Sequence, residues 1–206
     1  MFLSYAWRVS QPPAHREGVP GRRPATSRDE IVTAAMALFT RDGYEATSVE
    51  QIAEAAHISR RTLFRYFPGK ADIPWGDFGA QLEGMRRRLA AIPVEQPVPE
   101  ALADALVAFN TFPDTENDVH RERMRLLLGV DELNAHGTLK YADWRAAIAE
   151  WAAHRSGGSP RDLVPAALAQ AALGIALSAY RVWIDEPGAD QRRLHELLRA
   201  GTRILA

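Results

Sequence analysis

The sequence contains no cysteine, and this absence excludes two kinds of site. Without thiolates there is neither a disulfide framework nor a cysteine-ligated metal centre, and a reducing compartment is permitted. An excess of charge of one sign is also lacking, because 25 Lys and Arg face 26 Asp and Glu. Residues 1–70, however, carry ten basic against seven acidic side chains, which permits a local face that binds phosphate.

Secretion and membrane signals are also missing from the sequence. The apolar residues within 1–7 are too few for a signal-peptide core, and Pro, Gly and Arg follow them. Leu163–Tyr180 approaches the length of a membrane span, but it is rich in alanine and closely flanked by charged residues. We therefore expect a cytoplasmic protein with no membrane partner, in which this segment is a buried bundle helix. Its small residues are our candidates for a homodimer interface: Ala169, Ala172, Gly174 and Ala176.

Helix-capping signals recur along the N-terminal third of the chain. Ser27 followed by Glu30 forms a capping box that begins a first helix, which Gly43 then ends. Thr47 followed by Glu50 forms a second capping box. A third helix begins at the cap Ser59.

The remainder of the chain also reads as helices, separated by Pro and Gly. The third helix stops at Pro68, and Lys70 begins a long helix that reaches roughly Ala91. No alternating strand pattern and no repeat is present. The sequence thus predicts an all-α protein of about nine helices, with a three-helix head and a helical bundle. We expect a flexible arm at 1–26, a head at 27–73 and a body at 74–206.

Residues 49–66 have the pattern of a helix-turn-helix, which needs apolar residues where two helices cross and a small residue at the tightest point. Ala53 provides the small residue, and His57 lies in the turn, where left-handed backbone is needed and glycine is commoner. The apolar positions are Ile52, Ile58, Leu63 and Tyr66.

The second helix of this motif begins with the residues that would enter the major groove of double-stranded operator DNA. Arg60 and Arg61 are the predicted base readers, because arginine matches the acceptors of guanine in a bidentate way. Taken singly, each is as well explained as a solvated surface residue; together with the caps and the crossing pattern they favour DNA binding. Further predicted contacts, mostly to phosphate and with the arm reaching the minor groove, are Arg22, Arg23, Thr47, Ser48, Ser59, Thr62, Tyr66 and Lys70.

The stretch IVTAAMALFTRDGYEATSVEQIAEAAHISRRTLFRYFPGKADI resembles the DNA-binding head of the TetR family of regulators. The resemblance covers residues 28–73 and implies phosphate contacts at Thr47, Phe64, Tyr66 and Lys70. Phe64 departs from the usual tyrosine, so it has no hydroxyl to offer a phosphate.

Four shorter blocks extend the resemblance over most of the chain: PWGDF at 74–78, FNTFP at 109–113, HRERMRLLL at 120–128 and AHGTLKYADWR at 135–145. They are similar to the TetR-type regulators of the mycofactocin system. This resemblance implies an acyl-CoA-responsive C-terminal domain, a homodimer, and a repressor that a small-molecule effector releases from a palindromic operator. It implies neither a metal nor a cofactor, and no catalytic residue.

The body offers apolar and aromatic side chains that could surround such an effector, although stripes of this kind are usually plain core. Clustered arginines at 86–88, or those at 121, 123 and 125, could meet the phosphates of an acyl-CoA. The predicted ligand contacts are Phe109, Phe112, Arg123, Met124, Leu127, Leu128, Tyr141, Trp144 and Ile148.

Two alternatives compete with a ligand-released repressor. A DNA-binding dimer without any effector fits the same residues. An all-α enzyme acting on acyl thioesters is disfavoured, because there is no cysteine, no serine in a nucleophile elbow and no HExxH pair.

Overall fold

The computed structural model describes residues 26–206, and this range contains nine α-helices, three short 3-10 helices and no strand. The all-α prediction of about nine helices is confirmed. In chain order the elements are α1 (Arg28–Asp42), α2 (Val49–Ala55), α3 (Arg60–Tyr66), η1 (Lys70–Trp75), α4 (Phe78–Ala91), α5 (Val98–Phe109), η2 (Asp114–Glu116), α6 (Asn117–Gly129), α7 (Asp131–Ser156), α8 (Leu163–Asp185), α9 (Gln191–Thr202) and η3 (Arg203–Leu205). The predicted minor-groove residues Arg22 and Arg23 lie outside the described residues.

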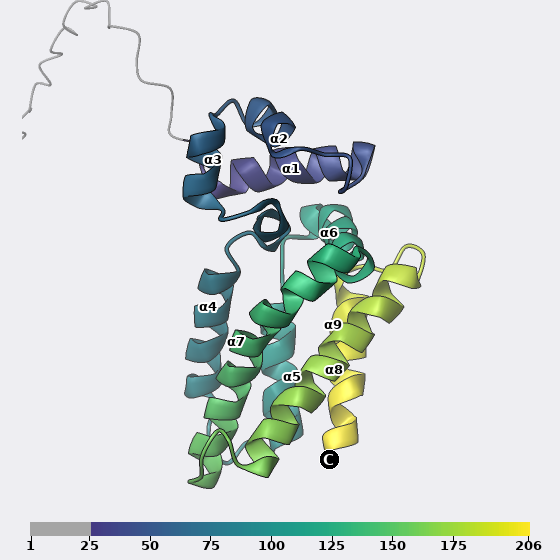
Figure 1. Ribbon diagram of the computed structural model, residues 1–206. Coiled ribbons are helices and arrows are strands. Elements are labelled where there is room, and N and C mark those ends of the chain that lie inside the picture. The colour runs from purple at the N-terminus through teal and green to yellow at the C-terminus, as the bar shows by residue number, and fades with distance from the viewer. Residues whose placement is uncertain (1–25) are drawn as a thin grey trace, which may run out of the picture.

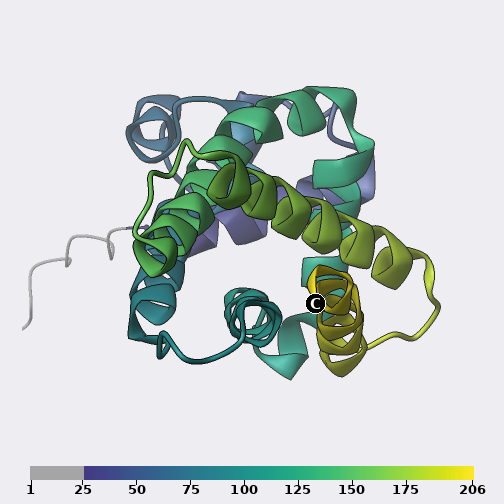
Figure 2. The same ribbon diagram turned by 90° about the horizontal axis from the view of Figure 1, so that it is seen from below.

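Helices α1 to α3 form a head that lies on one end of a longer bundle (Figure 1). In the bundle, α4 packs on α5, α5 on α9, α9 on α8, α8 on α7, and α7 again on α4. Figure 2 shows this ring of five helices from the end opposite the head. α6 crosses near the head and packs on α7 and α8, so it closes the ring on that side.

The caps of the head follow the sequence at two of three helices. At α1, Ser27 and Glu30 form the predicted capping box, and Ser59 accepts a hydrogen bond from the backbone N–H of Thr62 at α3. The second predicted box, Thr47 with Glu50, is wrong by one residue. Ser48 caps α2 and pairs with Gln51.

Thr47 is not available as a cap because its side chain turns inward. It is only 1% exposed, and its hydroxyl donates to the carbonyl of Gly43 at 2.8 Å. This bond satisfies a carbonyl directly after the end of α1, so the next hydroxyl in the chain takes the cap of α2. His57 has φ +55° in the turn before α3, which confirms the predicted left-handed position.

The predicted helix from Lys70 to Ala91 is interrupted in the structure. Its first part is the 3-10 helix η1, and α4 begins only at Phe78. Pro74 lacks an N–H for a helical hydrogen bond, and Gly76 adopts φ +57° and ψ −132°, which a side chain would disfavour. Asp77 then caps α4 by accepting from the N–H of Ala80. The chain can therefore change direction between head and body.

The apolar segment of α8 packs inside the bundle, as the sequence predicts, against α7 and α9. α8 is the one helix of the described range that is long and apolar enough to span a membrane by length and composition. The predicted dimer stripe needs correction, because Ala169, Ala172 and Ala176 are buried within the protomer. Of the four residues, only Gly174 is exposed, and a Cβ added there would meet nothing within 4 Å beyond the backbone of its own helix.

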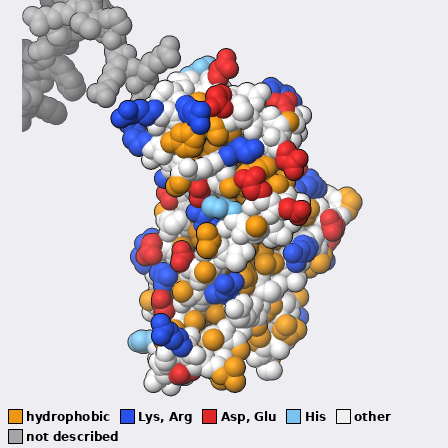
Figure 3. Space-filling model, in the orientation of Figure 1, with side chains coloured by type: hydrophobic (Ala, Val, Ile, Leu, Met, Phe, Trp, Pro, Cys, Tyr) orange, Lys and Arg blue, Asp and Glu red, His pale blue; other side chains and the backbone are white. Residues whose placement is uncertain are grey.

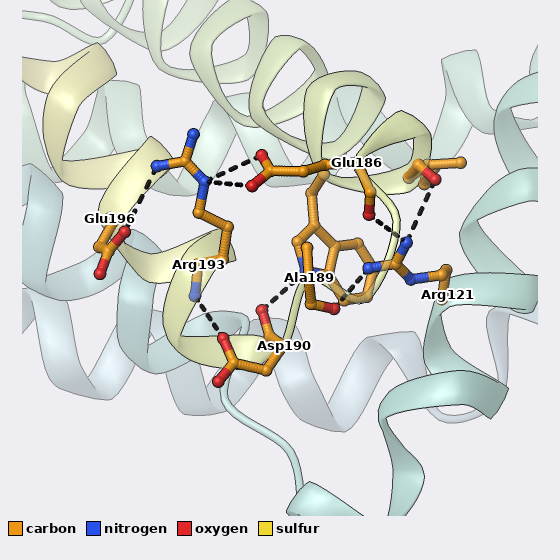
Figure 4. Close-up of polar contacts among 8 residues, drawn as sticks. Arg121, Glu186, Ala189, Asp190, Arg193 and Glu196 are labelled. Carbon is orange, nitrogen blue, oxygen red and sulfur yellow. Dashed lines mark hydrogen bonds and ion pairs between the residues drawn. The ribbon is translucent and has the colours of Figure 1, made fainter.

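One buried arginine joins α6 to the corner between α8 and α9 (Figure 4). Arg121 is 7% exposed, and its guanidinium donates to the carbonyls of Ile184, Glu186 and Ala189. It also lies 4.7 Å from the ring centre of Trp183. Arg121 was a candidate cation for a ligand, but these carbonyls already use its donors.

Replacing Arg121 with methionine should keep the apolar contact with Trp183 but leave three carbonyls without their charged donor. We expect Arg121→Met to lower the free energy of unfolding by about 3 kcal/mol, measured by urea denaturation. The matched control is Arg192→Met in α9. The side chain of Arg192 is 84% exposed, and its ion pair with Asp190 is long, at 4.0 Å. That control should stay within about 0.5 kcal/mol. Equal changes in the two variants would show that the buried clamp contributes little.

Candidate DNA interface and ligand cavity

The predicted base readers lie on the exposed surface of the head. Lys and Arg side chains gather on one side of the head around an apolar patch in the space-filling view (Figure 3). Arg60 and Arg61 are exposed in the first turn of α3. Arg60 pairs with Glu50 at 2.8 Å and lies 5.4 Å from the ring centre of Phe64. Arg61 has no ion pair within residues 26–206, so its donors face solvent.

The predicted phosphate contacts fall into two groups. Ser48, Ser59 and Phe64 are exposed, although the two hydroxyls are engaged as helix caps. Tyr66 is half-buried and its hydroxyl donates to the carbonyl of Thr26 at 2.6 Å. The buried position of Thr47 does not favour a side-chain contact with phosphate. Thr62, half-buried in the first turn of α3, shares a hydrogen bond of 2.9 Å with the hydroxyl of Ser59.

Lys70 holds η1 to the head. Its ammonium group donates to the carbonyls of Tyr44 at 3.0 Å and of Thr47 at 3.2 Å. It also lies 4.1 Å from the ring centre of Tyr44. An ammonium has three donors, so one is left for a phosphate.

Three polar contacts join η1 and the neighbouring Tyr44 to the first turns of α7. Asp72 of η1 accepts from His136 at 3.1 Å and from Lys140 at 3.0 Å. Burial would raise the pKa of Asp72, but the hydrogen bonds and charges of Lys140 and His136 outweigh it and hold this pKa below its ordinary value. In parallel, the hydroxyl of Tyr44 donates to Glu132 at 3.0 Å. We call the contacts of Asp72 with His136 and Lys140 the latch.

A cavity of about 160 Å³ lies in the body directly beside η1. Seven predicted ligand contacts line it: Phe109, Phe112, Arg123, Met124, Leu127, Tyr141 and Trp144. Two predicted ligand contacts do not line this cavity: Ile148 is fully buried core, and Leu128 lies outside the lining. Each of the two lies on a helix that also carries lining residues, Ile148 on α7 and Leu128 on α6. The spacing of apolar residues along a helix does not distinguish core positions from positions on the cavity wall.

The sequence reasoning missed the wall that η1 and α4 provide. Trp75 and Phe78 line the cavity, and the ring of Trp75 meets those of Phe78 and Tyr141 edge-on at 5.4 Å. Gly137 makes room for this packing, since a Cβ there would be 3.1 Å from Trp75. The motif PWGDF carried the available signal, because Pro74 and Gly76 disfavour a continuous helix on either side of Trp75.

A chain of hydrogen bonds from three helices forms the polar side of the cavity. Asn110 donates its side-chain N–H to the carbonyl of Leu106 at 2.7 Å, so its amide oxygen is left to accept from the hydroxyl of Tyr180 at 2.6 Å. The oxygen of Tyr180 must then accept from Nε2–H of His120 at 2.8 Å. Burial, followed by the charge of Arg123, lowers the pKa of His120 to about 3. His120 is therefore neutral, with its proton on Nε2.

Two further cavity residues carry buried donors that lack partners. The Nε1–H of Trp75 and the Nε–H of Arg123 are buried and make no hydrogen bond. Burial lowers the pKa of Arg123 from its ordinary value. In the part of the chain that the structure describes, no group of three or more His, Asp or Glu could hold a metal ion.

Comparisons with known proteins agree with this arrangement. Residues 31–73 match the family described as "Bacterial regulatory proteins, tetR family", and residues 96–206 match the family described as "MftR C-terminal domain". A protein of Mycobacterium tuberculosis assigned as the mycofactocin biosynthesis transcriptional regulator MftR is 45% identical over 166 residues, 81% of this chain and 84% of the relative.

Solved structures share the fold. FadR of Thermus thermophilus, a repressor in complex with lauroyl-CoA, is 25% identical with a TM-score of 0.57, and the match covers 87% of this chain and 93% of FadR. FadR of Bacillus subtilis is 18% identical with a TM-score of 0.61, over 87% of this chain and 97% of that one. These relatives are regulators, which decides against the enzyme alternative. The chain belongs to the TetR family of transcriptional regulators and carries an MftR-type C-terminal domain.

Proposed function

We propose that the protein is a cytoplasmic homodimeric repressor that a small-molecule effector, a long-chain acyl-CoA, releases from a palindromic operator. One observation carries this proposal. The six residues of η1 hold the helix-turn-helix at one end, through Lys70, and form the wall of the cavity at the other, through Trp75. A ligand in the cavity would therefore press on the segment that positions the head.

The DNA contacts of the proposal begin with Arg60 and Arg61 as base readers in the major groove. Arg61 is free of ion pairs among the described residues, whereas Arg60 would have to leave Glu50. Ser48, Ser59, Thr62, Tyr66 and Lys70 would set position on the phosphates, and Phe64 would contribute apolar contact only. Arg22 and Arg23 would reach the minor groove. Two heads of a dimer would meet half-sites about one helical turn apart.

The effector class is supported by one relative, and the size of the cavity sets a condition on how such an effector would bind. FadR of Thermus thermophilus, with the same fold at 25% identity, is bound to lauroyl-CoA. The cavity, at about 160 Å³, is close in size to an engineered cavity of roughly 150 Å³ that holds benzene. A long acyl chain would thus require the lining to move. Trp75 is part of that lining, so the same movement would shift η1 and the head.

The homodimer would form on the exposed face of α8. The buried alanines of this helix are used within the protomer, but Gly174 lies on its exposed side with Leu163, Val164 and Val182. These three side chains are 82%, 73% and 49% exposed, which is unusual for apolar residues without a partner surface.

Binding to the operator, and release from it, is the first test. Fluorescence anisotropy with the intergenic DNA upstream of the gene should show tight binding that lauroyl-CoA weakens by roughly 5- to 150-fold. Arg61→Ala should weaken binding of the unliganded protein about tenfold or more, because a bidentate base contact is lost. Arg87→Ala on α4 of the body is the control and should bind as the native protein does. Operator binding that no acyl-CoA alters would favour the alternative, a DNA-binding dimer without an effector.

The latch should transmit the effect of the ligand. In Asp72→Asn, Lys140 and His136 lose their carboxylate, so head and body should move more independently. We expect lauroyl-CoA to change the operator Kd of this variant by less than about threefold, well below the usual coupling range. Asp114→Asn, at an exposed position of η2, should respond like the native protein. An undiminished response in Asp72→Asn would mean that coupling takes another route.

The latch should also have a defined pH range. Because the pKa of Asp72 is held below its ordinary value of about 3.9, its contribution to stability is present above that pH and is lost as pH falls through the folded-state pKa. The unfolding free energies of the native protein and Asp72→Asn should therefore differ between pH 5 and 8 and converge on acidification. A difference that grows on acidification would be inconsistent with this contact.

The dimer face can be tested at Gly174. A Gly174→Leu side chain meets nothing in the protomer, but it would separate two α8 helices that approach closely. Light scattering after size exclusion should then show a dimer dissociation constant raised at least about tenfold, the equivalent of roughly 1.4 kcal/mol. Gly79→Leu, also in open space on α4, should remain a dimer. If both variants dimerise normally, the interface lies elsewhere.

A further inference from the structure

We infer that the ligand of the cavity is an amphiphilic anion, an apolar body with an anionic oxygen group, and that Arg123 binds this group. The inference rests on the proposed function in placing the effector in this cavity. It adds the chemistry by which the cavity would choose its ligand.

Arg123 is a half-buried charge without an ion pair among the described residues. It lines the cavity from α6, its Nε–H is buried without a partner, and no ion pair to it exists within residues 26–206. Glu116 also lines the cavity and favours the charged form of Arg123 from beyond ion-pair distance, but it is exposed in η2. A guanidinium stays protonated in proteins, so it does not escape the cost of burial by losing its proton. An anion in the cavity would remove this cost.

The contrast with Arg121 shows that α6 does not leave its arginines unpaired in general. Arg121, two residues earlier, donates to three carbonyls at the corner between α8 and α9. Arg125, two residues later, pairs with Glu122 at 3.1 Å and donates to the carbonyl of Ile184 at 3.2 Å. Of these three, Arg123 is the one that faces the cavity, and it is the one with unused donors.

A second unused donor points to the same ligand chemistry. The Nε1–H of Trp75 is buried, lines the same cavity and has no acceptor. Buried polar atoms in native proteins nearly always have partners, so two orphaned donors in one cavity call for acceptor oxygens from outside the chain. Trp75 belongs to η1, which makes this contact the point where ligand binding would reach the head.

Of the other polar residues of the cavity, Glu116 carries a negative charge, but it is exposed in η2 and makes no ion pair with Arg123 among the described residues. His120 is neutral, and its Nε2–H is committed to Tyr180, which in turn donates to Asn110. The remaining wall is aromatic and aliphatic and suits an apolar body: Phe78, Phe109, Phe112, Met124, Leu127 and Trp144. The cavity therefore combines one cation that has no ion pair with largely apolar walls.

The anionic oxygen could come from a free carboxylate or from a phosphate of an acyl-CoA, and three probes of equal chain length separate these sources. Dodecanoate carries a carboxylate, lauroyl-CoA carries phosphates, and dodecanol has the same chain without a charge. By isothermal titration calorimetry, at least one of the anions should bind the native protein about tenfold or more tightly than dodecanol. Binding of dodecanoate identifies the carboxylate as sufficient, and binding of lauroyl-CoA alone identifies the phosphates.

Arg123→Gln tests the role of the guanidinium. It should weaken binding of the anion roughly 10- to 100-fold, as expected for loss of a charged hydrogen bond, and leave dodecanol within about twofold. Arg125→Gln is the matched control on the same helix and should bind all three probes as the native protein does. Without ligand, Arg123→Gln should unfold at the same or a higher temperature, because it removes a half-buried charge that has no ion pair. A folded variant therefore remains available for the measurement.

Three results would overturn the inference: equal binding of dodecanol and the anions, unchanged anion binding by Arg123→Gln, or no binding of either anion. Calorimetry without DNA tests ligand recognition by Arg123 separately from operator release, which tests the proposed function. If the anion binds through Arg123 but does not release the operator, the recognition stands and the release mechanism is wrong. If dodecanol releases the operator as well as the anions do, release stands and the charge preference is wrong.

Discussion

The hydrogen bonds from Lys70 to the carbonyls of Tyr44 and Thr47 make η1 part of the head, although its far end belongs to the body. This is possible because Pro74 and Gly76 stop the helix and let the chain turn. A single continuous helix from residue 70 to 91 would carry the head rigidly on α4. With the break, no continuous helix fixes the head to α4, and what packs against the six residues of η1 helps to set the position of the head.

Polar, partly buried contacts join head and body in addition to the apolar core, which runs through both parts. The side chain of Asp72 is 14% exposed and that of Lys140 is 29% exposed. The favourable energy of their ion pair therefore barely exceeds the free-energy cost of removing the two charges from water. Polar contacts of this kind orient the head relative to the body, but they contribute little to the free energy of unfolding. A ligand needs a preference of only a few kcal/mol between two head positions to shift their populations.

Local signals in the sequence predicted what local hydrogen bonds determine. The caps at Ser27 and Ser59 and the left-handed His57 follow from neighbouring residues, and all three are confirmed. The error at Thr47 has a non-local cause, because its burial against the end of α1 decides that Ser48 becomes the cap. Most cavity residues were predicted from apolar stripes, but the hydrogen bonds among His120, Tyr180 and Asn110 join positions 60 to 70 residues apart. No periodicity in one helix reports such a partnership.

Arg121 and Arg123 show that residue type alone does not determine the role of a side chain. Both stand in the run HRERMR of one helix, and the sequence assigns them the same possible role. A helix advances about 100° per residue, so positions two apart face nearly opposite ways. One guanidinium donates to carbonyls at the end of α8, and the other lies at a cavity, where its buried Nε–H has no acceptor. The energetic consequence differs as well, because the contacts of Arg121 stabilise the fold, whereas Arg123 would be stabilised by the proposed anionic ligand. Such a residue would couple binding to stability, since the cost of its unpaired charge is what would favour an anion as the ligand.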